Sequence, residues 1–355
     1  MRVAWFPQEY VDNPYLTQLR NSLQGLGVEF EGSAPWTFGR RWLWRNRGKV
    51  QLLHLHVVQR FYAYKATRAR LRWVVRFARN LMLARVLGYR TVFTLHDLKP
   101  FDVLHPLWVD HMGHWVAVNL TDAVMVHYES GRRAVAERFG RRNGVFVCHH
   151  PSYIGLYPNE IPRDLARLRL GIAERHILFL FFGGIRPSKG IDGLIPAFRR
   201  LTGDEPRLLI VGRPWHPPEY LDALIKEARG DERIGVVAQF IPEEMVQLYL
   251  NAADAVVLPF KDVLTSGSTL LAMSFARPVV APAKGCLIDE VPPGTGILYD
   301  PSDPDGLYMA LQRCRSEDLR MMGEKAYEWA SRFTFERLAQ ETLAAYRGDA
   351  ACSAT

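Results

Sequence analysis

The alternation of apolar strands with helical stretches constrains this chain more than any other feature. In the first 150 residues, RVAWF (2–6) and TVFTLHDL (91–98) are examples of apolar runs separated by segments with helical spacing. The pattern starts again with HILFLFF (176–182) and AVVLPF (255–260). Strands regularly separated by helices form parallel sheets that are covered on both faces. We therefore expect an α/β fold of two doubly wound, Rossmann-like domains that face each other across a cleft.

The boundary between these domains is expected in a proline-containing stretch. With 355 residues, 48% of them apolar, the chain is long enough for two separate cores. We assign residues 1–155 to the first domain and residues 156–334 to the second. Residues 335–355 are expected to form a C-terminal helix that packs back on the first domain and ends in a frayed tail.

The stretch FFGGIRPSKGIDGLI (181–195) joins a buried strand to a helix through a glycine-rich, basic loop. Glycines let the backbone approach a ligand closely, and a helix start offers N–H groups and a positive dipole end. Arg186 and Lys189 add two cations, so the stretch is typical of an anion site. A basic surface loop without a ligand is the alternative.

A second loop of this kind follows the strand at 255–260. Ser266, Gly267, Ser268 and Thr269 come just before the helical run LLAMSF. Plain helix capping explains one or two of these residues but not four in a row. Two anion cradles in one domain suit a diphosphate better than a single carboxylate.

The order and spacing of these segments resemble the donor domain of the GT-B glycosyltransferases, especially glycosyltransferase family 4. The resemblance rests on FFGGIRPSKGIDGLI, RLLIVGR, FIPEEMVQLYLNAADAVVLPF, TSGSTLLAMSFARPVVAP, GTGILYDPSDPDGL and FTFERLAQETLAAYR. In the first half, DNPYLTQLRNSLQGLGVEF, LLHLHVV and TVFTLHDLKPFD look like the acceptor domain of members that assemble polysaccharides.

The resemblance implies a hexosyltransferase. It would move a sugar from a UDP- or GDP-linked donor to a hydroxyl of a lipid-linked saccharide, in the assembly of a cell-surface polysaccharide or glycolipid. The first domain would bind the acceptor and the second the donor, with retention rather than inversion of the anomeric configuration. No cofactor and no metal are expected, and the four widely spaced cysteines give no metal-ligand pattern.

The resemblance also implies roles for individual residues. Lys189 matches the lysine that neutralises the donor diphosphate, and Arg186 takes over from the usual arginine, whose position is held by Gly184. Leu271 stands where the family has its ribose-binding glutamate, and Asp262 lies one residue from the other glutamate position. The predicted donor-binding residues are Gly184, Arg186, Lys189, Arg213, Asp262, Ser266, Gly267, Ser268 and Thr269.

His96 is the predicted catalytic residue, because it ends a buried strand and matches the family histidine that lies against the transferred sugar. Such an imidazole can bind a sugar hydroxyl or handle the proton of the acceptor. His54 and His56 alternate on one strand and share a face, and His56 is taken as acceptor-binding. Asn13 and Tyr15, at a helix start after the first strand, complete the predicted acceptor-binding set.

Positive charge is concentrated near the N-terminus. Residues 1–90 hold 16 Lys and Arg but only four acidic residues. Arg68, Arg72, Arg76 and Arg79 follow helical steps within a helix expected at 66–87, with Leu71, Val74, Val75, Ala78 and Leu81 on another side. Together with the aromatic residues nearby, residues 36–90 suit peripheral contact with an anionic membrane. We expect a cytoplasmic protein at the inner face of the plasma membrane, and no nucleic-acid partner, because no nucleic-acid-binding module is apparent.

Other functions remain compatible with parts of this pattern. A nucleotide-sugar epimerase shares the architecture and would consume the donor without an acceptor. A non-catalytic, basic membrane- or nucleic-acid-binding protein fits the absence of the two glutamates. An NAD dehydrogenase fits less well, because no G-x-G-x-x-G follows the first strand.

Overall fold

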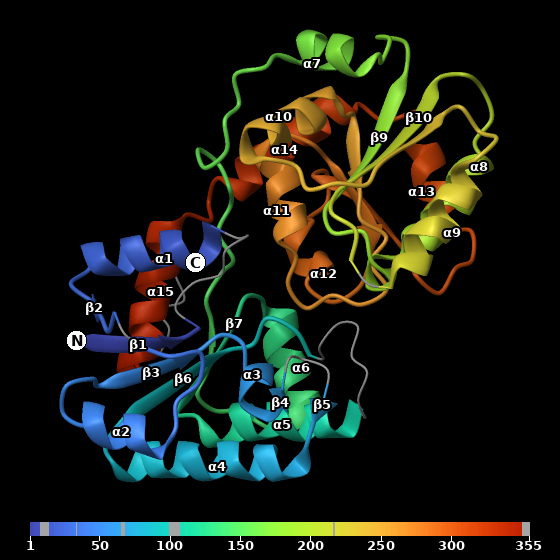
Figure 1. Cartoon of the computed structure of the whole chain (residues 1–355). Helices are drawn as coiled ribbons and strands as arrows, with labels where there is room; N and C mark the ends of the chain where they lie inside the picture. The colour runs from blue at the N-terminus through green and yellow to red at the C-terminus, as the bar shows by residue number, and fades with distance from the viewer. Residues whose placement is uncertain (8–13, 33, 65–67, 99–106, 216, 350–355) are drawn as a thin grey trace. The chain divides into compact units, whose positions relative to one another are not determined.

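The chain folds into two compact units (Figure 1). The computed structural model describes residues 1–7, 14–32, 34–64, 68–98, 107–215 and 217–349. Unit 1 comprises Met1–His150 together with Thr334–Thr355, and unit 2 comprises Pro151–Phe333. Each unit contains a parallel sheet of six strands, which confirms the predicted α/β class with two Rossmann-like domains.

The sheet of unit 1 has the strand order β2-β1-β3-β6-β7-β8, and all neighbouring strands run parallel. The strands are β1 (Arg2–Phe6), β2 (Glu29–Phe30), β3 (Leu52–Leu55), β6 (Arg90–Thr94), β7 (Ala123–Val126) and β8 (Val145–Val147). The helices are α1 (Pro14–Gly25), α2 (Arg40–Asn46), α3 (Gln59–Tyr62), α4 (Leu71–Val86), α5 (Leu107–Leu120), α6 (Glu129–Phe139) and α15 (Phe335–Arg347).

The sheet of unit 2 has the order β11-β10-β9-β12-β13-β14 and is also parallel throughout. Its strand order reverses between β9 and β12, and ligands of such sheets bind at the carboxyl ends beside the reversal. The strands are β9 (Ile177–Phe182), β10 (Pro206–Val211), β11 (Ile234–Val237), β12 (Ala255–Val257), β13 (Val279–Pro282) and β14 (Gly296–Tyr299). The helices are α7 (Arg163–Leu170), η1 (Pro187–Lys189), α8 (Ile191–Arg199), α9 (Pro218–Ala228), α10 (Glu243–Ala252), α11 (Gly267–Ser274), α12 (Leu287–Glu290), α13 (Gly306–Arg313) and α14 (Leu319–Ala330).

Helix α15 is held on unit 1 by polar contacts at two points. The Tyr346 hydroxyl lies 2.7 Å from Nδ1 of His54 and accepts a hydrogen bond of 2.9 Å from the Trp5 indole. One turn earlier, Glu341 accepts hydrogen bonds from the backbone N–H and the ring of His149, at 2.6 and 2.9 Å. The last residues of the chain, 350–355, lie outside the described residues.

The helix expected at 66–87 was placed too early and in the wrong register. Helix α4 begins only at Leu71, because the chain before it forms a small antiparallel hairpin of β4 (Ala63–Tyr64) and β5 (Arg68–Ala69). Arg68 therefore lies in a strand. Leu71 and Val75 are 44% and 50% exposed, whereas Phe77 is buried. The packed face follows Val74, Phe77, Leu81 and Ala84.

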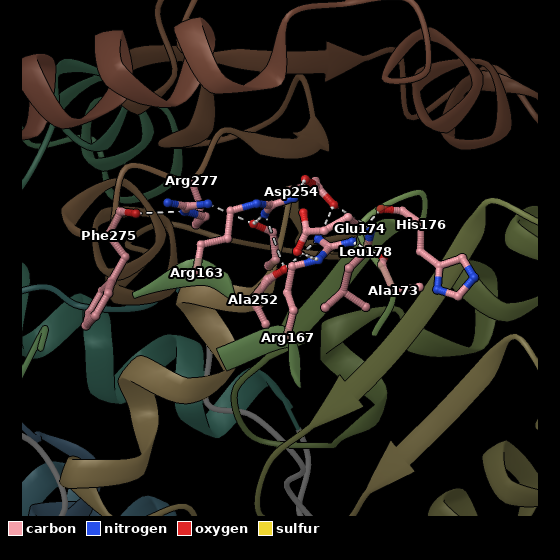
Figure 2. Close-up of polar contacts among 11 residues, drawn as sticks. Arg163, Arg167, Ala173, Glu174, His176, Leu178, Ala252, Asp254, Phe275 and Arg277 are labelled. Atoms are coloured by element: carbon pink, nitrogen blue, oxygen red, sulfur yellow. Dashed lines mark hydrogen bonds and ion pairs between the residues drawn. The ribbon is translucent and has the colours of Figure 1, made fainter. Parts of the chain in front are cut away.

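A buried arginine network joins α7, β9 and β12 at the amino ends of these strands (Figure 2). Arg167 is fully buried, and its guanidinium donates to Asp254 at 3.1 Å and to the carbonyls of Ala173 and His176 at 2.8 and 2.6 Å. Asp254 also accepts the backbone N–H of Leu178 at 2.7 Å. The network holds the amino ends of β9 and β12 together, at the opposite end of the strands from their carboxyl ends.

Replacing Arg167 should destabilise unit 2 strongly. Arg167→Gln removes one donor to Asp254 and the buried guanidinium that serves the carbonyls of Ala252, Ala173 and His176, and we expect a loss of about 3–5 kcal/mol in the free energy of unfolding, measured in urea titrations. The control is Arg175→Gln, which breaks the exposed ion pair of Arg175 with Asp204 and should cost less than about 1 kcal/mol. Equal effects of the two changes would contradict this account of the network.

Candidate functional site

The loop after β9 is shaped by close contact between two backbones. Gly183 and Gly212 have φ angles of +145° and +152°, which side-chain-bearing residues rarely adopt. A Cβ atom on Gly212 would collide with the carbonyl oxygen of Gly183. Only glycine at position 212 therefore allows the ends of β9 and β10 to lie this close.

Parallel pairing continues beyond these strand ends. The N–H of Ile185 donates to the carbonyl of Arg213 at 2.9 Å, and the N–H of Trp215 donates to the carbonyl of Ile185 at 3.0 Å. The ring of Trp215 lies next to Gly184, because a Cβ there would be 2.9 Å from the indole nitrogen. Arg213 is exposed, and its guanidinium lies 5.7 Å from the Trp215 ring.

Lys189 is fixed against the segment that follows β12. Its ammonium nitrogen lies 3.9 Å from the centre of the Phe260 ring, which is a close cation–π contact. The N–H of Lys261 donates to the carbonyl of Ser188 at 3.1 Å, and Gly190 lies so close to the Pro259 carbonyl that a Cβ would collide with it. Arg186 is the N-terminal flanking residue of η1, so both predicted cations lie within one short turn.

The turn before α11 divides into a capping part and a part left for a ligand. Ser266 Oγ accepts the backbone N–H of Thr269 at 3.2 Å and its hydroxyl at 2.8 Å, and both side chains are buried. These two residues cap the helix. Ser268 is half-buried, and its Oγ lies 3.5 Å from the position of a Cβ on Gly183. The two predicted anion loops are therefore neighbours, on the two sides of the strand-order reversal.

Asp262 and Leu271 are both half-buried in the same region. Leu271 has no polar atom to offer a ribose, as its sequence position suggested. Asp262 has a neighbour, Val263, whose carbonyl is so close to Gly285 that a Cβ on this glycine would collide with it. The backbone next to Asp262 is thus packed closely against the loop that contains Gly285.

In unit 1 a chain of histidines lies at the carboxyl ends of four strands. His56 and His96 follow β3 and β6, and the ring nitrogens Nδ1 of His56 and Nε2 of His96 are 3.4 Å apart. The ring centres of His96 and His127 are 5.4 Å apart, and those of His127 and His150 are 5.1 Å apart. Tyr15 stacks on His150 at 5.2 Å and contacts the rings of His96 and His127 by their edges. Three predicted residues, His96, His56 and Tyr15, are thus brought together, while Asn13 lies outside the described residues.

The neighbouring histidine, His54, has a structural role. The Trp5 indole can only donate, so the Tyr346 hydroxyl accepts from it, and this hydroxyl also lies 2.7 Å from Nδ1 of His54. Nε2 of His54 is hydrogen-bonded to the Thr94 hydroxyl, 2.7 Å away. Both ring nitrogens of His54 are therefore occupied.

Burial keeps these histidines neutral. Loss of hydration lowers the pKa of His54, His56 and His96 well below the usual value, and each is lowered further by a neighbouring imidazole. Burial lowers the pKa of His127 to about 4, although the hydrogen bond to the Cys148 carbonyl opposes the shift. Nε2 of His56 and Nε2 of His127 are buried without a partner in the described part of the chain. Within that part, no three His, Cys, Asp or Glu side chains are arranged to hold a metal ion.

Solved structures with a similar fold cover almost the whole chain. Sucrose-phosphate synthase from Thermosynechococcus elongatus superposes with a TM-score of 0.74 and 20% identity, over 98% of each chain. Anabaena Alr3699/HepE in complex with UDP gives a TM-score of 0.73 and 18% identity, over 98% of this chain and 100% of the other. At this identity the likeness concerns the fold alone.

Sequence comparison finds similarity to a protein family and to named enzymes, in addition to the shared fold. Residues 176–317 match the family described as Glycosyl transferases group 1. The GDP-mannose:glycolipid 4-beta-D-mannosyltransferase of Xanthomonas campestris pv. campestris is 29% identical over 301 residues, which cover 81% of this chain and 76% of the relative. Together with the fold, these matches identify the chain as a GT-B glycosyltransferase that is similar to the family 4 type. A D-inositol 3-phosphate glycosyltransferase of Nocardioides sp. is 33% identical over 221 residues, which cover 57% of this glycosyltransferase and 48% of the relative.

Sequence reasoning missed several neighbours of the predicted residues in this glycosyltransferase. Trp215 lies against Gly184, and no motif pointed to it. His127 and His150 join His96, which the repeated appearance of histidine at successive strand ends would have indicated. Tyr153 lies close to the donor turn, because a Cβ on Gly267 would be 2.7 Å from its hydroxyl.

Substituting Gly212 should disturb the loop after β9. Gly212→Ala introduces a Cβ that collides with Gly183 in a backbone conformation unsuited to alanine, and we expect a loss of about 1–3 kcal/mol in the free energy of unfolding. Gly193→Ala is the matched control, since its Cβ would meet open space on helix α8 and should stabilise the protein by up to about 1 kcal/mol. Chemical denaturation measures both, and a neutral Gly212→Ala would refute the backbone contact.

The histidine chain should make stability depend on pH. Unfolded histidines bind protons below about pH 6.5, whereas the buried histidines stay neutral until the pH reaches lower values. The free energy of unfolding should thus be highest above pH 6.5 and should fall between about pH 6.5 and pH 5. In urea titrations across this range, His56→Asn should show a shallower fall than the wild type. Identical slopes would contradict the assignment of His56 as a buried neutral group.

Proposed function

We propose that this glycosyltransferase moves a hexose from a GDP- or UDP-linked donor to a hydroxyl of a lipid-linked saccharide. The observation that carries the proposal is the contact between the two anion loops of unit 2. Gly183 and Ser268 are neighbours, and Lys189 is fixed on Phe260 directly after the adjacent strand. The names of two relatives add a donor and an acceptor type, GDP-mannose and a glycolipid.

The role of unit 2 is to stabilise the departing diphosphate. Arg186 and Lys189 supply fixed positive charge, and the first N–H groups of α11 add the positive end of a helix dipole. Fixed groups of this kind are most effective where negative charge develops as the sugar–phosphate bond breaks. They supply the charge that a divalent metal would otherwise provide, so we propose a reaction without metal or cofactor. Because Ser266 and Thr269 are occupied by capping, we propose Ser268 as a contact of the nucleotide, and the Thr265 hydroxyl beside this turn is a second polar group without a protein partner among the described residues.

The role of unit 1 is to present the acceptor. A neutral His96 can accept a hydrogen bond from a sugar hydroxyl, and burial keeps its pKa low enough for the neutral form to persist at neutral pH. Retention of the anomeric configuration is proposed from the family resemblance. The Xanthomonas relative is named as a 4-beta-D-mannosyltransferase. The anomeric configuration of the product of this chain, measured by NMR, tests whether the reaction proceeds with retention.

Peripheral membrane contact is proposed for the outer face of α4. Leu71, Val75, Met82 and Val86 are between 44% and 81% exposed and recur at helical spacing, which gives an apolar stripe. Arg72, Arg76 and Arg79 lie beside it, as in helices that rest on anionic headgroups. No helix among the described residues has the length and apolar character needed to span a bilayer. The proposed site of action is the cytoplasmic face of the plasma membrane, which suits the proposed lipid-linked acceptor.

Nucleotide binding and sugar transfer test the proposal together. GDP or UDP should raise the thermal unfolding midpoint of the wild type. Lys189→Ala should weaken the binding of that nucleotide about tenfold or more, because it removes a charge-assisted contact. The control, Lys226→Ala, removes an exposed lysine of α9 and should bind as the wild type does.

The same nucleotide-sugar is then incubated with and without a lipid-linked saccharide. Release of nucleoside diphosphate that requires the acceptor supports transfer. Conversion of the donor sugar without any acceptor would support an epimerase instead. A wild type that no nucleoside diphosphate stabilises would contradict the proposed donor site.

A further inference from the structure

Unit 1 contains a pocket that does not involve the histidine chain. It has a volume of about 300 Å³ and lies between helix α4 and the segment that leads into α2. Phe38, Phe61 and Phe77 form its apolar wall, and Arg40, Arg76 and Arg79 line it as well. This volume is at the small end of ligand pockets and suits a headgroup rather than a nucleotide-sugar.

The wall of the pocket is rigid. The rings of Phe38 and Phe61 lie 4.9 Å apart, and Phe61 stacks on Phe77 at 4.7 Å. All three rings are at most 5% exposed. Asn80 donates to the carbonyl of Phe38 at 3.3 Å and so ties the segment before α2 to α4. An anion in this pocket would meet arginine and other polar side chains that stand on a preformed aromatic wall.

The positive charge around the pocket is not compensated. Residues 32–96 contain 14 Lys and Arg and no Asp or Glu. In the described part of the chain, the guanidinium groups of Arg40, Arg76 and Arg79 form no hydrogen bond or ion pair with protein atoms. Three arginines that line one pocket without a carboxylate suit a phosphate group, which accepts several such donors.

The surroundings favour a lipid as the source of that phosphate. Arg76 and Arg79 lie on the exposed side of α4 next to its apolar stripe, of which Val75 is 50% and Met82 is 55% exposed. Trp44, on α2, is also 57% exposed. A free phosphate would gain nothing from these apolar side chains, whereas a phospholipid places acyl chains beside its headgroup.

We propose that the pocket lined by Arg40, Arg76 and Arg79 binds the phosphate of an anionic phospholipid headgroup. The inference rests on the proposed membrane contact and deepens it. Non-specific attraction between charges would need no defined binding site, whereas this proposal assigns one.

Two variants of equal charge distinguish a pocket from general attraction. The pocket variant is Arg40→Gln, Arg76→Gln and Arg79→Gln combined, and the control is Arg41→Gln, Arg72→Gln and Arg85→Gln combined, on the same two helices and including Arg72 beside the same apolar stripe. Binding is measured by co-sedimentation with vesicles of phosphatidylcholine mixed with phosphatidylglycerol. Each arginine that contacts an anionic surface contributes roughly fivefold in affinity. The pocket variant should therefore bind roughly 100-fold more weakly than the wild type, and the control variant less than about tenfold more weakly.

Soluble glycerol phosphate is the ligand in a second measurement, of thermal unfolding. It should raise the thermal unfolding midpoint of the wild type and of the control variant, but not of the pocket variant. Equal losses of vesicle binding in the two variants would overturn the pocket. Stabilisation by glycerol phosphate without any binding to vesicles would overturn the lipid as its source. Nucleotide binding should be unchanged in both variants, and Lys189→Ala should still bind vesicles, so a failure here is distinct from a failure of the donor site.

Discussion

Close backbone contacts of glycines at the carboxyl ends of β9, β10 and β12 are the constraint on which the two predicted anion loops depend. Gly212 lies against the Gly183 carbonyl and Gly190 lies against the Pro259 carbonyl, and neither position has space for a Cβ. These contacts bring the loop after β9 onto the segment after β12. Lys189 then rests on Phe260, and Ser268 lies beside Gly183. The position of Lys189 therefore follows from glycine packing together with its contact with the Phe260 ring.

The two units use similar sheets for different chemistry. In unit 2 the strand ends carry glycines, cations and a helix start, which suit a negatively charged ligand. In unit 1 the corresponding ends carry histidines that burial keeps neutral, which suit hydroxyl groups. The C-terminal helix completes unit 1, because the Tyr346 hydroxyl is hydrogen-bonded to both the Trp5 indole and the His54 ring. This difference supports the proposal that unit 2 binds the donor and unit 1 the acceptor.

Much of the fold was predictable from sequence because its signal is local. Unbroken apolar runs such as 177–182 form strands buried on both faces, and glycine followed by a helix start indicates a ligand loop. The register of α4 was not predictable, because Leu71 and Val75 are as apolar as the buried Val74. Helix α4 has a second apolar stripe that faces outward. Apolar character alone therefore does not indicate which side of this helix faces the core. The hairpin before α4 was missed for a related reason, since its pairing joins residues that have no turn signature in the sequence.

The candidate site was predictable in its location but not in its division of labour. Four small residues at the start of α11 looked alike in the sequence, yet Ser266 and Thr269 are occupied in capping and Ser268 is left beside Gly183. Trp215 could not be found, because its contact with Gly184 depends on pairing beyond the strand ends. Hydrogen bonds and backbone contacts between distant segments decide such roles, and a single sequence does not display them.

Hydrogen–deuterium exchange of the full chain with and without saturating GDP or UDP tests the central claim most directly. If both loops of unit 2 bind the diphosphate, the amides of residues 183–190 and those of residues 266–271 should exchange more slowly when the nucleotide is bound. Both segments should show this protection in the same experiment. Slower exchange confined to unit 1, or to only one of the two loops, would contradict the account.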